Sequence, residues 1–481
     1  MTFAIVTALL LAQPTPAVAA PPAAPPPAGA AAQPFVAPRP PRLPTLSLDE
    51  AIREAQARNL DLQASRARLD QARQQHWKAW SYYLPQASAG ASYTHNDLPD
   101  VTFALPSAFA IRDVGAPAPG SASPALPGAP TPYALIPTGY ESFIIQKQNQ
   151  LAAQFEVTQA LLAPQAWFGI AAASAGERAA EQSIEGVRRQ ILFGVAQAYY
   201  GAASLVQVVA IQERQLAIAL AHERDARVRY EAGTTPKVTL LRAEIDRARA
   251  EQDLKRAQNS YQGAKVSLAT LLDREQVDFD VGLPPSPELP PDLDALEREA
   301  PRLRPEVQAA ESNLVVAERS HDGVLARYAP NVGAFARWQW ANLSGFTGKY
   351  ATWALGVAIS WDLFDGGLRE ADLREAAARV READASRASA RAKAVEEVER
   401  ARLDLDSAVA NREKAKEQLA LARENQKLVD VNYRAGAATY IEVTDANAAL
   451  LSAELTQVSE ALAADLAGLR LLLAAGVFDP R

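Results

Sequence analysis

The chain has 481 residues, 33 prolines, no cysteine and a formal net charge of −7. The lack of cysteine excludes disulfides, thiolate metal sites, a cysteine nucleophile and a lipid anchor on an N-terminal cysteine. The negative charge argues against nucleic acid as a partner, because nucleic-acid binding requires clustered Lys and Arg.

The N-terminus is typical of an exported protein. An apolar run over residues 3–12 is followed by Ala17-Val18-Ala19, which predicts a signal peptide at 1–19. Residues 20–45 are expected to form a proline-rich linker. No later stretch is expected to have the 18 or more uncharged apolar residues of a membrane-spanning helix. The mature chain is therefore expected to be periplasmic, secreted or an outer-membrane β-barrel.

The prolines divide the chain into segments. Twelve lie between Pro14 and Pro44, nine between Pro99 and Pro137, and seven between Pro284 and Pro305. A proline in a helix interior costs about 3 kcal/mol. The tracts between these clusters are therefore predicted to hold the long helices, and the clusters are predicted to be connectors.

An internal repeat is the strongest pattern in the sequence. Pro85 corresponds to Pro330 at an offset of 245 residues, whereas residues 229–234 correspond to 432–437 at an offset of 203. The first copy therefore contains extra residues, which we assign to an outer loop at 97–150. The predicted organisation is repeat 1 at 46–272, a linker at 273–292, repeat 2 at 293–476 and a C-terminal tail at 477–481.

Each repeat is predicted to contain the same helices. A first helix covers 47–81 or 293–328, and Pro301 and Pro305 are expected to disturb the start of the second of these. A long helical tract covers 165–230 or 366–433, and a last helix covers 236–272 or 439–475. The tract at 366–433 has i,i+4 charge pairs on its surface and a narrow apolar stripe, which is typical of coiled-coil packing. These pairs are Glu370/Arg374, Glu375/Arg379 and Glu396/Arg400.

Four segments alternate between apolar and small or polar residues, which predicts strands at 86–96, 151–162, 331–340 and 352–362. Trp353 and Trp361 are eight residues apart, or about 26 Å along a strand. An outer-membrane barrel has an apolar band of about 25 Å between two aromatic girdles. We therefore predict a membrane girdle of Trp338, Trp340, Trp353 and Trp361. The alternative is a half-buried sheet of a soluble domain.

Four strands are too few for a closed membrane barrel, which starts at about eight. Open sheet edges are not tolerated in lipid. If these strands cross a membrane, several chains must share one barrel, and three chains would supply twelve strands.

The order, spacing and duplication of several short motifs resemble the TolC-like outer-membrane efflux and secretion channels. These motifs are Leu-Ser-Leu-Asp-Glu-Ala at 46–51, Asn-Leu-Asp-Leu at 59–62, Arg-Pro-Glu-Val at 304–307, the Leu-Pro and Ala-Pro junctions at 84–85 and 329–330, Trp-Asp-Leu-Phe-Asp-Gly-Gly at 361–367, and the Tyr-x-x-Gly turns at 230–233 and 433–436.

The resemblance implies a homotrimer with a 12-stranded β-barrel in the outer membrane that continues into a 12-helix α-barrel in the periplasm. It implies an exit duct for a tripartite efflux pump or a type I secretion system. The implied partners are outer-membrane lipid, a periplasmic adaptor protein and an inner-membrane pump of the RND, ABC or MFS type. It does not specify the cargo.

The resemblance also implies candidate functional residues. The turns at Gly233 and Gly436 would lie at the periplasmic tip, where the adaptor docks. Glu442 and Asp445 would form an acidic gate, and Tyr433, a further gate residue, would help to hold the tip turns together. A structural role competes with the gate, because Glu442 with Thr439 also fits a capping box and Asp445 suits a helix N-terminus.

The sequence predicts neither an enzyme nor a cofactor or metal site. His76, His95, His222 and His321 are scattered and lack the spacing of a zinc helix. Residues 345–350 resemble a phosphate loop but are too short. Two functional hypotheses therefore stand: a trimeric outer-membrane duct, and a soluble periplasmic coiled-coil adaptor or scaffold without a pore.

Overall fold

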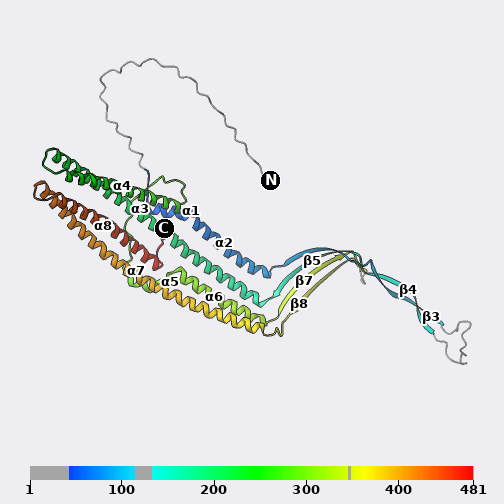
Figure 1. The fold of residues 1–481 in the computed structure, drawn as a ribbon. Helices are drawn as coiled ribbons and strands as arrows, with labels where there is room; N and C mark the ends of the chain where they lie inside the picture. Colours follow the sequence, from blue (N-terminus) through cyan, green and yellow to red (C-terminus); the bar gives the residue numbers. More distant parts are fainter. Residues whose placement is uncertain (1–42, 114–132, 345–347, 480–481) are drawn as a thin grey trace, which may run out of the picture. The chain divides into compact units, whose positions relative to one another are not determined.

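The computed structural model describes residues 43–113, 133–344 and 348–479 (Figure 1). The predicted signal peptide, nearly all of the linker at 20–45, the centre of the loop at 97–150, part of the 345–350 segment and the last two residues lie outside this range. Within the described residues the chain is mostly helical, with one four-stranded sheet and two two-stranded sheets.

Two helices of nearly equal length organise the helical part. They are α3 (Pro164–Glu231) and α7 (Leu368–Arg434), with 68 and 67 residues, so each extends for about 100 Å. Each leads through a tight turn into a 35-residue helix, α4 (Lys237–Leu271) or α8 (Tyr440–Ala474). The helix α3 packs against α4 and α8, and α7 packs against α8.

The first helix of each repeat is broken in two, whereas the sequence predicted one helix of about 35 residues in each repeat, disturbed at its start by Pro301 and Pro305 in the second. The pieces are α1 (Leu48–Arg58) and α2 (Leu60–Trp80) in the first half, and α5 (Leu293–Leu303) and α6 (Pro305–Leu325) in the second. Short 3₁₀ turns, η1 (Ser81–Tyr83) and η2 (Ala326–Tyr328), follow α2 and α6.

The two breaks have different causes. Asn59 adopts a non-helical backbone, and its side chain accepts from Leu62 N–H (3.0 Å) and donates to the Leu271 carbonyl (2.8 Å). The buried amide thus caps α2 and ties it to α4. In the second half Arg304 precedes Pro305, and a residue before proline is pushed out of the helical region.

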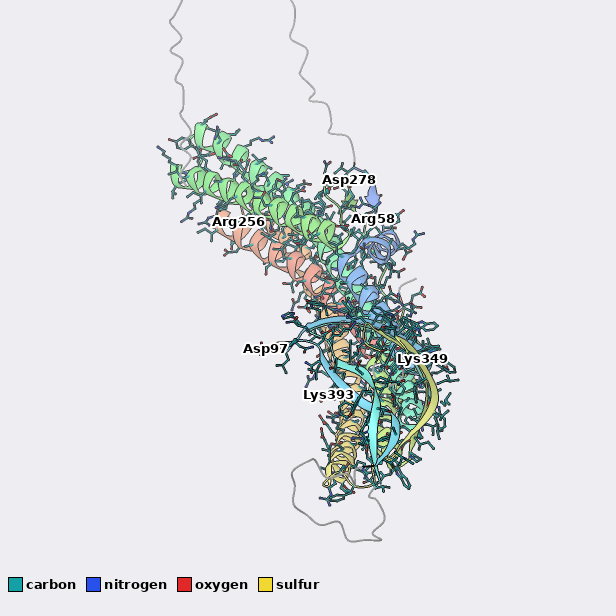
Figure 2. All side chains as sticks on the ribbon, turned by 90° about the vertical axis from the view of Figure 1, so that its right-hand side faces the viewer. Arg58, Asp97, Arg256, Asp278, Lys349 and Lys393 are labelled. Atoms are coloured by element: carbon teal, nitrogen blue, oxygen red, sulfur yellow. The ribbon has the colours of Figure 1, made fainter. Side chains whose placement is uncertain are left out.

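The four-stranded sheet is antiparallel, with the order β2-β5-β7-β8. Its strands are β2 (Gln86–His95), β5 (Asn149–Leu162), β7 (Asn331–Ala341) and β8 (Ala351–Ser360). In the view along the strands, Asp97 and Lys349, which flank β2 and β8, lie on opposite sides of the sheet (Figure 2). Among the described strands, β2 and β8 each have one neighbour, so each leaves one edge open.

The predicted outer loop at 97–150 contains a hairpin that the sequence analysis missed. Its strands are β3 (Val101–Asp113) and β4 (Tyr133–Gln146). Prolines argued against strands here, but Pro106 and Pro137 both lie at shifts in the pairing register. A two-stranded hairpin tolerates proline at such irregular positions.

The end of the predicted N-terminal linker and the predicted linker at 273–292 contribute two short strands that pair with each other. The strand β1 (Thr45–Leu46) runs parallel to β6 (Asp280–Val281). The buried Tyr199 hydroxyl of α3 donates to the Leu46 carbonyl (2.7 Å) and lies 3.1 Å from the Gly282 carbonyl oxygen. One side chain thus holds both connectors against the long helix.

The main core lies where α3 meets α1, α4, α8 and these connectors, around Leu192, Tyr199, Leu268 and Phe279. Among the described residues, one helix, α3, is long and apolar enough to cross a membrane by length and composition. The expectation that no later stretch would pass this test was therefore wrong. The uncharged run between Arg189 and Glu213 supplies much of this core, which accounts for its apolar composition.

Two of the three predicted charge pairs on α7 form. Glu375 contacts Arg379 at 2.5 Å, and Glu396 contacts Arg400 at 3.0 Å. The prediction of the third pair, Glu370 with Arg374, was wrong, because Glu370 instead accepts a hydrogen bond from the Tyr328 hydroxyl of η2 (3.2 Å). Tertiary contact at the start of α7 thus replaces the local pairing.

Replacing Asn59 by Ala is expected to reduce the free energy of unfolding by about 1–2 kcal/mol, since a cap is lost and the partly buried Leu271 carbonyl loses the Asn59 donor. The measurement is the change in the urea midpoint of unfolding, followed by circular dichroism. The matched control is Asn411→Ala, at an exposed position of α7. Equal midpoints for the two variants would contradict the role of Asn59.

Candidate functional site

The two helix–helix turns at the tip have the same backbone geometry. Gly233 and Gly436 have φ angles of +73° and +77°. In the first turn Gly233 N–H donates to the Tyr230 carbonyl and Thr234 N–H to the Arg229 carbonyl, and the second turn repeats both bonds. This is the Schellman termination, whose left-handed residue is normally glycine. The tight turns at these glycines are therefore present.

Tyr433 lies in a small aromatic cluster next to these turns. The Arg229 guanidinium stacks over its ring, 4.9 Å from the centroid, and the Tyr440 ring is 6.3 Å away. The Tyr440 hydroxyl donates to Asp246 of α4 (3.1 Å), and burial raises the pKa of Tyr440, so it remains protonated. Tyr433 thus belongs to a cluster that joins the α3–α4 and α7–α8 hairpins.

Sequence analysis missed Tyr440 and Asp246 because their distance along the chain is 194 residues. It also gave no role to His222. The edge of the His222 ring contacts Tyr440, and its Nε2 lies 3.2 Å from Asn447 Nδ2. An amide nitrogen only donates, so this contact requires an unprotonated Nε2. Burial lowers the pKa of His222 and outweighs the nearby carboxylates of Asp430, Asp225 and Asp246.

Glu442 and Asp445 lie on the exposed surface of the first turns of α8. The predicted capping box is present: Thr439 N–H donates to Glu442 (2.6 Å), and the Thr439 side chain accepts from Glu442 N–H. The hydrogen bond from Thr439 N–H lowers the pKa of Glu442. Glu442 is therefore an exposed, ionised carboxylate whose position is set by its capping contact.

The sheet has one continuous apolar face. Trp353, Leu355, Val357 and Ile359 alternate along β8 and are exposed in the single chain. In register they lie opposite Trp338, Ala336, Ala334 and Val332 of β7. The apolar alternation continues through Phe155 and Val157 of β5 to Ala89 and Ala87 of β2.

The four girdle tryptophans lie near the two ends of this sheet. Trp338 and Trp353 are direct partners in the β7–β8 ladder, and Trp340 lies two residues further along β7. Trp361 follows the other end of β8, where its indole N–H donates to the Tyr328 carbonyl (3.0 Å). All four indole rings are substantially exposed.

The opposite face of the sheet is polar. Arg337 of β7 bonds Glu156 of β5 at 2.8 Å, and Gln154 also donates to that carboxylate. On the same face the Phe335 ring fills the space above Gly356, where an added Cβ would lie 2.8 Å from the ring. A sheet with one apolar and one polar, charge-paired face fits a wall between lipid and water.

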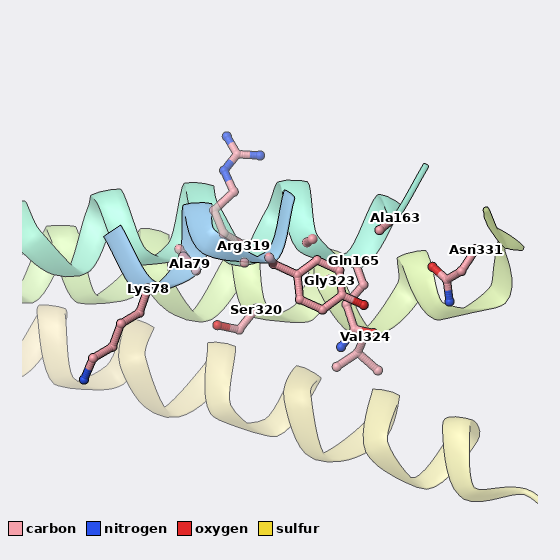
Figure 3. A pocket seen from close by; sticks show the side chains of 13 residues that line it. Lys78, Ala79, Ala163, Gln165, Arg319, Ser320, Gly323, Val324 and Asn331 are labelled. Atoms are coloured by element: carbon pink, nitrogen blue, oxygen red, sulfur yellow. The ribbon is translucent and has the colours of Figure 1, made fainter. Parts of the chain in front are cut away.

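A cavity of about 460 Å³ lies where the strands meet the helices, between α2, α3 and α6 (Figure 3). Its charged lining residues, Lys78 and Arg319, point away from each other. Small residues such as Ala79, Gly169 and Gly323 form much of the remainder. Within the described part of the chain, no cluster of three or more His, Asp or Glu side chains could hold a metal ion.

The fold is that of TolC-like outer-membrane channels, and it matches several solved structures along nearly the whole chain. CusC aligns with a TM-score of 0.70 and 18% identity, covering 90% of this chain and 93% of that one. The outer membrane protein VceC of Vibrio cholerae aligns with a TM-score of 0.67 and 21% identity, covering 89% of this chain and 96% of VceC. The MtrE outer membrane channel of Neisseria gonorrhoeae, in its open state, aligns with a TM-score of 0.64 and 20% identity, covering 89% of this chain and 89% of MtrE.

Residues 296–477 match the family described as Outer membrane efflux protein. A search of curated proteins found no match to this chain. The family match and the fold together confirm the resemblance to TolC-like efflux channels. They support a location in the outer membrane, with the helical part in the periplasm. The matched family consists of channel proteins, not enzymes.

Burial of His222 beside Asn447 predicts that the stability of the tip depends on pH. The pKa of His222 is lowered in the folded chain from about 6.5, so the unfolded chain takes up a proton first as the pH falls. Stability is therefore expected to fall as the pH drops below about 6.5. The measurement is thermal unfolding at pH 7.5 and 5.5. His222→Gln should lose less stability between these values, and an equal loss would contradict this role.

Proposed function

We propose that three copies of this chain form a passive exit duct across the outer membrane. The observation that carries the proposal is a four-stranded sheet with one apolar face, one polar face and two open edges. In the duct the polar face lines the water-filled passage and the apolar face meets lipid.

The open edges require further strands. Neither β2 nor β8 has a second neighbour among the described strands of the chain. Unpaired backbone groups are too costly in hydrocarbon, so β8 of one chain must pair with β2 of the next. Closure of three such sheets gives a 12-stranded barrel, and the helices below it give the α-barrel.

Exposed apolar stripes on the outer helices support the same assembly. Within the chain α4 packs chiefly against α3, and α7 against α6 and α8. Both helices nevertheless carry large exposed side chains at helical spacing. The stripes are Val238, Leu241 and Ile245 on α4, and Leu421, Leu428 and Val431 on α7. A head-to-tail contact between two such unlike faces generates a ring when the rotation between neighbouring chains closes, as the proposed barrel requires.

The element order supports an internal duplication. Helix, 3₁₀ turn, strand, strand, long helix and 35-residue helix occur in this order in each half, apart from the inserted β3–β4 hairpin. The boundaries that we propose remain 46–272 and 293–476, with a linker between them. A duplicated unit doubles the strands and helices that each chain contributes to the ring.

At the other end, the duct would meet the pump. We assign adaptor docking to the turns at Gly233 and Gly436, and the gate to Glu442, Asp445 and Tyr433. In three copies Glu442 and Asp445 place six carboxylates around one axis, which favours cations and hinders anions. The adaptor then joins the duct to an inner-membrane pump of the RND, ABC or MFS type. The passage itself needs no cofactor.

A soluble periplasmic scaffold is the second candidate, since long coiled-coil helices suit it. It would leave the large apolar side chains of β8 in water, and contiguous exposed apolar surface of this kind marks an interaction site. The duct accounts for this face and the scaffold does not.

Leu355→Arg is expected to impair membrane assembly, because a charge on the lipid face near the midplane costs about 2–4 kcal/mol. A residue on the polar face provides the control: Ala358→Arg lies opposite the uncharged Gly333 and should assemble normally. The measurement is the amount of heat-modifiable protein in the outer-membrane fraction. Wild-type protein that is wholly released by osmotic shock would refute the duct.

Glu442→Gln with Asp445→Asn is expected to reduce cation selectivity in single-channel recordings, since six negative charges leave the gate. Glutamine still completes the capping box, so the fold is preserved. Glu231→Gln, an exposed acid near the first tip turn, is the control and should leave selectivity unchanged. Unchanged selectivity in the double variant would refute the carboxylate gate.

A further inference from the structure

Two of the most exposed apolar side chains of the chain lie together after β8. Leu363 is 75% exposed and Phe364 is 87% exposed, in the loop that joins β8 to α7. This loop is well braced: Asp365 accepts from Arg369 N–H (3.2 Å) and Nε (2.9 Å), and Arg369 also donates to the Leu363 carbonyl (3.2 Å). The buried Arg369 side chain thus holds the backbone of this loop in place, while both apolar side chains are exposed.

A second exposed apolar pair lies at the opposite edge of the sheet. Trp77 is 67% exposed and Trp80 is 46% exposed, near the end of α2, which leads into β2. The Trp80 indole N–H donates to His76 Nε2 (2.9 Å), so this ring is also held in place. Figure 1 shows the end of α2 and the start of α7 on opposite sides of the sheet.

The two pairs lie at the same level along the strands. The strand β2 begins at Gln86, six residues after Trp80, and β8 ends at Ser360, four residues before Phe364. In a barrel of alternating antiparallel strands, the start of β2 lies beside the end of β8 of the neighbouring chain. Pairing of these edges therefore brings the two apolar pairs to the same border between chains.

We infer that Leu363 and Phe364 of one chain pack against Trp77 and Trp80 of the next, below each of the three strand junctions. The inference rests on the proposed three-chain barrel. Both surfaces are preorganised, so little conformational entropy is lost when they meet. Aromatic side chains buried at the centre of such contacts commonly dominate association. This contact would hold the chains together where the sheet passes into the helices.

Cysteine cross-linking tests this contact directly, because the chain has no cysteine of its own. The test variant combines Trp77→Cys with Phe364→Cys, and outer membranes are treated with a short bis-maleimide. The two positions lie at opposite edges of one chain, so a cross-link must join two chains. A covalent trimer on a denaturing gel is the expected product.

The matched control combines Trp167→Cys with Phe364→Cys. Trp167 is also exposed, but it lies at the start of α3 and follows the interior strand β5. This control and each single variant should remain monomeric on the denaturing gel. Equal cross-linking in the control would overturn the inference, since it would show collisions instead of a specific contact.

Native gels separate failure of the contact from failure of the duct. A three-chain species that yields no covalent trimer would overturn the contact and leave the proposed duct intact. Absence of any three-chain species would overturn both the contact and the proposed duct.

A measurement without cysteine complements the cross-linking: Phe364→Asp should lower the temperature at which the trimer dissociates by several degrees more than Phe364→Leu does. Equal dissociation temperatures would overturn the inference.

Discussion

The backbone of the two edge strands is the constraint on which the rest of this structure depends. In hydrocarbon every N–H and C=O group needs a protein partner, and β2 and β8 each leave one row of these groups unpaired within the described chain. A membrane location for this sheet is therefore physically reasonable only when copies share a barrel. The proposed trimer, the aromatic contact below the strand junctions and the ring of helices are consequences of that single requirement.

The helical end has a different chemistry, because it lies in water. There the two hairpins end in the same glycine turn, and ordinary polar contacts hold them together. Tyr440 donates to Asp246, Arg229 stacks on Tyr433, and His222 contacts Asn447. Each such contact replaces a contact with water that the unfolded chain makes, so its net energy is small. The gate that we propose at this end would be well served by contacts of this kind, whereas the proposed barrel would need permanent strand pairing.

The local periodicity of the sequence predicted much of the fold. Alternation over residues 353–361 indicated a strand where the structure has β8, and the absence of proline from 331–479 agreed with the long helix α7. The errors occurred where another part of the chain decided the outcome. Asn59 breaks the first helix through a bond to Leu271, Glu370 pairs with Tyr328, and β3 and β4 tolerate prolines at shifts in register.

The sequence by itself determined the long helices, the four strands of the main sheet and their apolar face, and where glycine permits a left-handed turn, because these depend on residues a few positions apart. Only the tertiary structure showed that Tyr440 meets Asp246 across 194 residues, that the connectors pair beneath Tyr199, and that Trp77 and Phe364 lie at opposite edges of one sheet. The physical reason is that such contacts depend on how whole helices and strands pack, and no local pattern in the sequence indicates which distant residue will be the partner.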